Sequence, residues 1–66
     1  MKNKLRVQRA IKNITQAELA EMIQVSRQTV NTIESGKYVP STVLALKMAK
    51  VFEVPVEAIF ELEEED

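Results

Sequence analysis

Two short helices joined by a tight turn are the strongest structural signal in this chain, and they occupy residues 15–36, TQAELAEMIQVSRQTVNTIESG. Thr15 followed three residues later by Glu18 has the pattern of a capping box, in which each side chain bonds the backbone N–H of the other residue. The first of the two helices is therefore predicted to begin at Gln16. Its apolar residues fall at helical spacing and predict one face packed on a core: Leu19, Ala20 and Ile23.

The second helix is predicted to begin after Ser26, which is a good N-cap, and to run to about Ser35. Gly36 can adopt the left-handed conformation that ends many helices, because it has no Cβ. Val30 and Ile33 lie three residues apart and should point inward. The outward positions then carry a set of polar side chains: Arg27, Gln28, Asn31 and Thr32.

The chemistry of that outward face suits a binding role as well as an ordinary hydrated surface. Polar side chains on the outside of a small helical domain usually do nothing more than contact water. A merely hydrated helix face is typically made of Glu and Lys, whereas this one carries Arg, Gln, Asn and Thr. The fork and amide groups of such side chains match the edges of guanine and adenine in the major groove of DNA. Side-chain chemistry alone leaves both interpretations open.

Size and composition exclude several classes of protein. Sixty-six residues form one domain with one small core, which oligomerisation would help to stabilise. The absence of Cys and His removes disulfides, thiol nucleophiles and the commonest metal ligands and general bases. We therefore expect no enzyme activity, no catalytic residue, no metal or other cofactor and no small-molecule ligand. No apolar run reaches the roughly 18 residues that span a bilayer, so a cytoplasmic protein without membrane contact is expected.

Charge is distributed unevenly along the chain, although the net charge is only −1. Five of the ten acidic residues lie at positions 61–66, an acidic C-terminal tail. Residues 1–60 carry nine basic and five acidic side chains, a net charge of +4, which suits a polyanionic partner. A block of like charges usually extends into water. The alternative for this tail is a short β-ribbon with the N-terminal segment.

The N-terminal segment is predicted to form a helix over Lys2–Lys12, with Leu5 facing inward and Val7 and Ile11 as further inward candidates. Arg9 lies one helical turn after Leu5, on the core side, where a charge needs a partner. Glu34, late in the second helix of the central pair, is the candidate partner for an ion pair. The alternative is that the Arg9 side chain extends along the surface into water.

The C-terminal half is predicted to contain two more helices. Ser41 should cap a helix over Thr42–Phe52, whose core stripe consists of Ala45, Met48, Ala49 and Phe52. Pro55 suits the first turn of a short fifth helix from Val56 to about Phe60. Apolar residues without a clear place in this core indicate the interface of a homodimer: Leu44, Val51, Val56 and Leu62. They could instead fill the core or be singly exposed.

Together these segments make the sequence similar to the lambda Cro/C1-type (XRE-like) helix-turn-helix family over roughly Leu5–Phe60. The similarity rests on segments in register: TQAELA, SRQTV, IESGK, PS before the fourth helix, and VPVEAIF. It implies an all-α, compact five-helix domain like that of lambda repressor, spanning residues 1–60 with the helix-turn-helix motif at about 16–35. It also implies a transcriptional regulator, most simply a repressor, that binds an inverted-repeat operator in double-stranded DNA as a homodimer.

The resemblance also assigns roles to single residues. It implies that base readers fall on Arg27, Gln28 and Thr32, with Asn31 beside them, and phosphate contacts on Gln16, Ser26, Lys37 and Tyr38. Thr29 is expected to lie next to a phosphate or a base. It places the family's ion pair between the first and third helices on Arg9 and Glu34. Gln24 departs from the family, which often has Gly with positive φ at this turn position. Keeping that conformation costs a non-glycine residue about 1–2 kcal/mol.

Two other functions remain as alternatives. An antitoxin-like protein-binding module would use the acidic tail, residues 61–66, to cover a toxin. An RNA-binding protein would need exposed aromatic side chains to stack on unpaired bases, and Tyr38 is the only Tyr or Trp in the chain.

Overall fold

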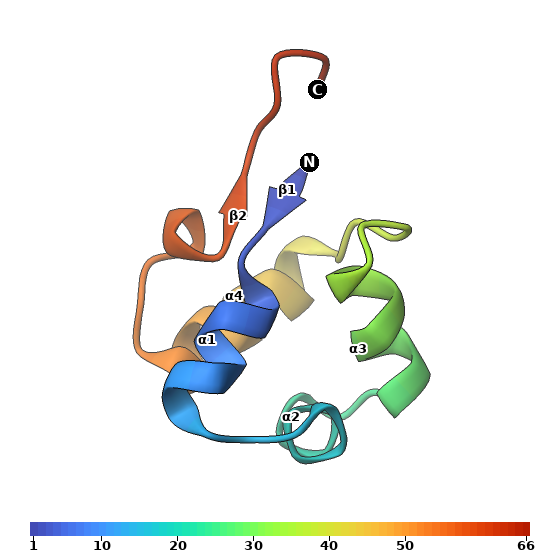
Figure 1. The fold of residues 1–66 in the computed structure, drawn as a ribbon, viewed down its shortest axis with the longest axis vertical. Coiled ribbons are helices and arrows are strands. Elements are labelled where there is room, and N and C mark those ends of the chain that lie inside the picture. The colour runs from blue at the N-terminus through green and yellow to red at the C-terminus, as the bar shows by residue number, and fades with distance from the viewer.

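Four α-helices surround one apolar core in the computed structural model, which describes residues 1–66, and a two-stranded sheet joins the two ends of the chain (Figure 1). The helices are α1 (Leu5–Lys12), α2 (Gln16–Ile23), α3 (Arg27–Glu34) and α4 (Thr42–Phe52). A 3-10 helix (Val56–Ala58) follows α4, and the strands are β1 (Lys2–Asn3) and β2 (Phe60–Glu61). None of the helices is long and apolar enough to cross a membrane.

The predicted starts of α2, α3 and α4 are confirmed, because each helix carries its own cap. Thr15 Oγ1 accepts a hydrogen bond from the backbone N–H of Glu18 at 3.0 Å, and Glu18 Oε1 accepts one from the N–H of Thr15 at 2.9 Å. These two bonds form the predicted capping box. The hydroxyls of Ser26 and Ser41 each accept a bond from the first turn of α3 and α4.

The turn between α2 and α3 keeps a left-handed residue although no glycine is present. Gln24 has φ 62° and ψ 45°, and the N–H of the next residue, Val25, bonds the carbonyl of Ala20 at 3.0 Å. Asn13 and Glu53 adopt the same conformation at the ends of α1 and α4. The departure from Gly therefore does not prevent a left-handed residue at this turn.

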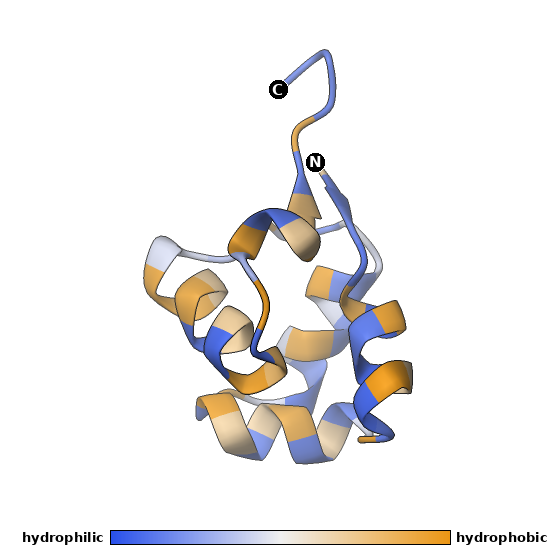
Figure 2. Cartoon of the chain, turned by 90° about the vertical axis from the view of Figure 1, so that its left-hand side faces the viewer, coloured by the Kyte–Doolittle hydropathy of each residue, from blue (hydrophilic) through white to orange (hydrophobic).

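The core is built from apolar side chains of all four helices and of the C-terminal segment. In Figure 2, apolar and polar stretches alternate along the helices, as expected for helices with one buried side. The inward residues predicted for α2 and α3 are confirmed. The eleven buried residues are Leu5, Leu19, Ala20, Ile23, Val30, Ile33, Leu44, Met48, Phe52, Ile59 and Phe60.

The first helix starts later than predicted. Lys2–Asn3 is extended and pairs antiparallel with Phe60–Glu61, so the helix begins at Leu5 and not at Lys2. The Asn3 side chain assists this start, because its Oδ1 accepts a hydrogen bond from the N–H of Leu5 at 3.2 Å. Pairing with a strand at the other end of the chain thus overrides local helix propensity.

The inward positions predicted for Val7 and Ile11 are also wrong. Their exposed fractions are 54% and 72%, whereas Leu5 is fully buried. At about 100° per residue, Val7 and Ile11 lie about 200° and 240° around the helix from Leu5, on the opposite side. Arg9, one turn after Leu5, takes the inward position instead, at 15% side-chain exposure.

The predicted fifth α-helix is a single 3-10 turn. It ends at Ala58, because Phe60 enters β2 and pairs with Asn3 through an extended backbone. Ile59 and Phe60 are nevertheless buried in the core, as predicted. Of the two alternatives for the tail, strand pairing applies to Glu61.

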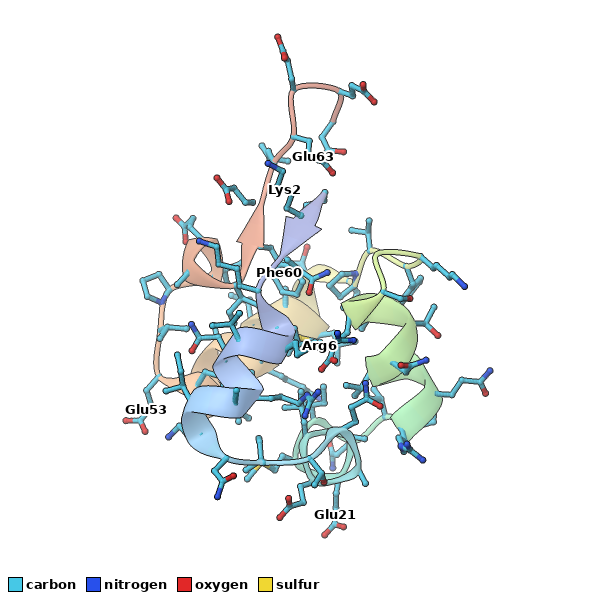
Figure 3. All side chains as sticks on the ribbon, viewed as in Figure 1. Lys2, Arg6, Glu21, Glu53, Phe60 and Glu63 are labelled. Carbon is cyan, nitrogen blue, oxygen red and sulfur yellow. The ribbon has the colours of Figure 1, made fainter.

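The two ends of the chain lie side by side at one end of the molecule (Figures 1 and 3). Beyond β2, the carboxylates of Glu63 and Asp66 contact the amino group of Met1 at 3.0 and 3.2 Å. The acidic tail therefore has partners within the chain.

Leu44 has a place in the core, contrary to the prediction. It is 9% exposed, because the first turn of α4 directs it inward. Val51 and Val56 are half-buried and pack against the core from its edge, whereas Leu62 is 77% exposed.

Candidate nucleic-acid interface

The outward side of α3 carries the polar side chains predicted to contact DNA. Arg27, Gln28 and Asn31 are exposed, while Thr29 and Thr32 are half-buried. In Figure 3 the side chains on the outer side of α3 extend away from the rest of the molecule. The buried Val30 and Ile33 hold the opposite side of α3 on the core.

Two open hollows lie along this side of the molecule and share Gln28. The first is lined only by polar residues, Gln16, Arg27, Gln28 and Asn31. The second is lined by Ser26, Gln28, Thr29, Thr32 and Tyr38. The structure thus brings eight of the nine predicted DNA-contacting residues to two adjoining hollows. The ninth, Lys37, is exposed in the loop beside Tyr38.

The end of α3 places that loop next to the helix. Gly36 has φ 79°, a left-handed conformation that reverses the chain direction. The N–H of Lys37 then bonds the carbonyl of Thr32 at 3.1 Å, which ties the loop to the last turn. Lys37 and Tyr38 therefore follow directly on the surface formed by α3.

Hydroxyl groups on α3 are partly engaged within the helix. The Thr32 hydroxyl donates to the carbonyl of Gln28 at 2.7 Å, and the Ser26 and Thr29 hydroxyls lie 2.8 Å apart. The guanidinium of Arg27 and the amide of Gln28 have no such partners among the hydrogen bonds of the chain. Of the α3 side chains on this surface, those of Arg27 and Gln28 are consequently the most available to an external partner.

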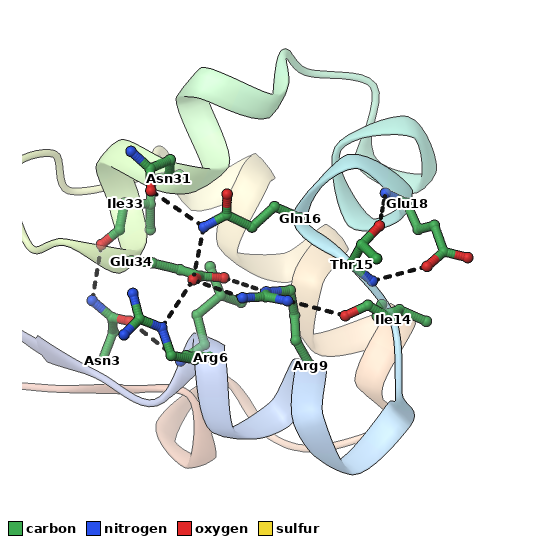
Figure 4. Close-up of polar contacts among 11 residues, drawn as sticks. Asn3, Arg6, Arg9, Ile14, Thr15, Gln16, Glu18, Asn31, Ile33 and Glu34 are labelled. Carbon is green, nitrogen blue, oxygen red and sulfur yellow. Dashed lines mark hydrogen bonds and ion pairs between the residues drawn. The ribbon is translucent and has the colours of Figure 1, made fainter.

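A cluster centred on Glu34 holds α1, α2 and α3 together (Figure 4). Arg9 binds both oxygens of the Glu34 carboxylate, through Nε and through Nη2, the latter at 3.0 Å from Oε1. Gln16 Nε2 donates to Glu34 Oε1 at 3.1 Å, and Arg6 Nε lies 3.5 Å from the same oxygen. The structure thus contains the ion pair predicted between Arg9 and Glu34. It adds Gln16 and Arg6 to that pair.

Glu34 is charged although its side chain is fully shielded from solvent. Burial raises the pKa of the Glu34 carboxyl, but the hydrogen bonds from Arg9 and Gln16 and the charge of Arg9 outweigh it and hold the pKa below its usual value of 4.5. The hydrogen bond to Glu34 raises the pKa of Arg9 in turn. At neutral pH the carboxylate is therefore ionised and can only accept hydrogen bonds.

Three features of the cluster were missed in the sequence. Asn3 Nδ2 donates to the carbonyl of Ile33 at 2.9 Å and so ties β1 to the end of α3. An Asn before a helix is a recognised local signal for helix capping. The contact of Asn3 with Ile33 spans 30 residues, so no local sequence signal announces it. The contacts of Arg6 with Glu34 and of Gln16 with Asn31 also join separate helices and were not predicted.

Comparisons with a family model and with known proteins all point to helix-turn-helix proteins. A helix-turn-helix family model matches residues 5–59. An uncharacterized HTH-type transcriptional regulator of Methanocaldococcus jannaschii is 53% identical over 66 residues, which is the full length of both chains. The uncharacterized HTH-type transcriptional regulator YgzD of Bacillus subtilis is 50% identical, also over both full lengths. Another, from Archaeoglobus fulgidus, is 44% identical over all of this chain and 93% of its own. The chain therefore belongs to the Cro/C1-type helix-turn-helix family of DNA-binding transcriptional regulators.

Proposed function

We propose that the protein is a repressor that binds an inverted-repeat operator as a homodimer, with α3 of each copy in successive major grooves. The observation that supports this most is the continuous polar surface from the start of α2, along α3, to Tyr38. None of the residues lining its two hollows is acidic. The nearby carboxylate of Glu34 is neutralised by Arg9. A surface of this kind suits a polyanion with readable base edges.

Base reading falls to Arg27, Gln28 and Thr32 in this proposal, with Asn31 beside them. Arg and Gln form paired hydrogen bonds with guanine and adenine, and Thr offers a methyl group and a hydroxyl. Phosphate contacts come from Ser26, Thr29, Lys37 and Tyr38 at the two ends of the surface. Gln16, at the start of α2, is a further phosphate contact in this proposal. Contacts to phosphates position the protein, whereas contacts to bases select the sequence.

A homodimer is supported by apolar surface elsewhere on the molecule. An open hollow is lined mainly by apolar side chains, which are Met1, Val39, Pro40, Ala45, Leu46, Val56 and Phe60. Val56, predicted at the dimer interface, is one of them, and the exposed Leu62 lies two residues beyond Phe60. This hollow shares no residue with the two polar hollows, so a second copy could cover it while α3 contacts DNA. Leu44 does not belong to the proposed interface, because it is buried.

Repression requires only that the bound dimer occupy DNA needed by the polymerase. Two α3 helices related by a two-fold axis would enter major grooves about 34–36 Å apart. The operator would then be an inverted repeat whose half-site centres are about 10–10.5 base pairs apart.

Selection of DNA from a random pool tests this proposal. The expected result is one enriched motif with two-fold symmetry and that half-site spacing. A reporter gene whose promoter contains the enriched motif should be transcribed less when the protein is present. Retention of DNA without any enriched sequence would contradict operator recognition. Enrichment of a single half-site would contradict the homodimer on DNA.

A further inference from the structure

The acidic tail, residues 61–66, carries a single apolar side chain, that of Leu62. Beyond β2 the chain extends away from the four helices (Figure 1), and Figure 2 shows one hydrophobic stretch there between hydrophilic ones. Leu62 is 77% exposed, the largest exposed fraction among the large apolar side chains of the molecule. Its apolar surface is therefore left uncovered in the single chain.

Leu62 is nevertheless held in place from both sides. The residue before it, Glu61, belongs to β2 and pairs with β1. After it, the N–H of Glu63 bonds Asp66 Oδ2 at 2.8 Å, and the N–H of Asp66 bonds the carbonyl of Glu63 at 3.0 Å. The carboxylates of Glu63 and Asp66 also contact the amino group of Met1. A side chain fixed in this way loses less entropy when a partner covers it.

The apolar hollow beside α4, which the proposed homodimer covers, has room for such a side chain. It has a volume of about 260 Å³, and Leu46, Val56 and Phe60 are among its lining residues. An apolar cavity of about 150 Å³ holds benzene, which is larger than the four-carbon side chain of Leu. Leu62 does not line this hollow. Within one chain, therefore, Leu62 and the apolar hollow do not cover each other.

The charges beside the tail and beside the hollow have opposite signs. Lys50 is exposed on α4 one helical turn after Leu46, so it lies at the rim of the apolar hollow. Lys50 forms no ion pair within the chain, and neither do the tail carboxylates of Glu61, Glu64 and Glu65. A tail that reaches the hollow of another molecule would bring these unpaired charges together.

We infer that Leu62 of one copy fills the apolar hollow of a second copy, with the neighbouring carboxylates at Lys50 of that copy. The inference rests on the homodimer of the proposed function and names the contact that joins its two copies. Phe60 lines the hollow and lies two residues before Leu62, so both features are at the same end of the molecule. A two-fold axis then lets each copy give one Leu62 and receive another, whereas a contact in one direction only would build open chains. No residue of α3 lines this hollow, so α3 stays available to DNA.

Sedimentation equilibrium of the full chain measures the dissociation constant of the dimer. Leu62→Ala should raise this constant about 10- to 100-fold, because the symmetric dimer loses buried aliphatic surface at two places. Ile11→Ala is the matched control, since Ile11 is 72% exposed on α1 and does not line the hollow. It should leave the constant unchanged. Added salt should weaken the wild-type dimer and have a smaller effect on Lys50→Ala.

A mixing experiment tests whether the contact is made between copies. Leu46→Glu places a charge on the wall of the hollow and should also prevent dimerisation, while Leu62→Ala keeps an intact hollow. A mixture of the two variants should form mixed dimers, because Leu62 of one variant can enter the intact hollow of the other. Leu46 and Leu62 are both exposed, so both variants should keep the fold and melt close to the wild-type monomer.

The possible failures can be told apart. An unchanged dimer in Leu62→Ala, or a mixture that associates no better than its separate variants, would overturn the inference and leave the homodimer of the proposed function standing. A wild type that stays monomeric up to millimolar concentration, or that grows beyond the dimer, would overturn it as well. Selection of an operator by the same preparation would still decide the proposed function.

Discussion

Replacing Glu34 by Ala tests the physical account of the fold most directly. Glu34 is fully shielded from solvent and binds Arg9 through both carboxylate oxygens. Removing one partner of a buried ion pair costs about 3–5 kcal/mol, because the other charge stays buried without compensation. Arg9 keeps one acceptor, the carbonyl of Ile14 at 3.0 Å, and is 15% exposed. We therefore place the loss in the free energy of unfolding near the lower limit, at about 3 kcal/mol.

A loss of this size is large for a chain of 66 residues. Domains are stable by about 0.05–0.15 kcal/mol per residue, which gives roughly 3–10 kcal/mol here. In a domain of this size each kcal/mol shifts the melting temperature by about 4–8 °C, so Glu34→Ala should melt roughly 12–24 °C lower. Urea unfolding and thermal melts at equal protein concentration measure both quantities, since a dimer would make stability depend on concentration.

Glu53→Ala is the matched control for this experiment. It removes the ion pair of Glu53 with Lys12, at 3.1 Å, in which both side chains are exposed. Exposed pairs contribute about 0.2–1 kcal/mol, so this variant should melt close to wild type. If Glu34→Ala were no less stable than Glu53→Ala, the reasoning from burial would be refuted. A double variant, Arg9→Leu with Glu34→Leu, should regain part of the loss because no charge is left unpaired.

Three further predictions concern pH, DNA and assembly. The folded-state pKa of Glu34 lies below its usual 4.5, so the contribution of this carboxylate to stability should be complete above about pH 5 and be lost as pH falls through the lowered pKa. Urea midpoints measured between about pH 7 and 3 should therefore fall less in Glu34→Ala than in wild type. Arg27→Ala should cost about 1–3 kcal/mol of binding free energy on the operator and relax the base preference at one position. Lys37→Ala should instead weaken binding to operator and random DNA alike and reduce the salt slope of binding by about one. Equal losses of binding to both DNAs for Arg27→Ala would show that Arg27 reads no base. Light scattering at micromolar concentration should give the wild type the mass of a dimer. Val56→Glu should be a monomer, because the substitution would bury a charge in the proposed interface. A dimeric Val56→Glu would place the interface elsewhere.

The sequence alone determined those parts of the structure that depend on neighbours within one helical turn. Thr15, Ser26 and Ser41 cap their helices through bonds to residues three positions later, and such short-range chemistry is visible in the sequence. The inward residues of α2 and α3 follow from helical spacing in the same way. The polar character of the outer face of α3 is likewise a local property.

Tertiary structure decided the features that require a partner far along the chain. Lys2–Asn3 reads as the beginning of a helix, yet pairing with Phe60–Glu61 makes it a strand and shortens both terminal helical segments. Leu44 lies outside the apolar stripe predicted for α4 and was therefore assigned to the dimer interface. Only the packing of α4 places it in the core.

The candidate site shows the same division between local and distant contacts. Its residues were proposed one by one from helix positions and, for Lys37 and Tyr38, from the loop that follows α3. The bonds that join Gln16 to Asn31 and Glu34 were not, because they connect two helices whose relative placement depends on the whole core. The orientation of the Gln16 amide therefore follows from tertiary packing and from the charge of one buried carboxylate.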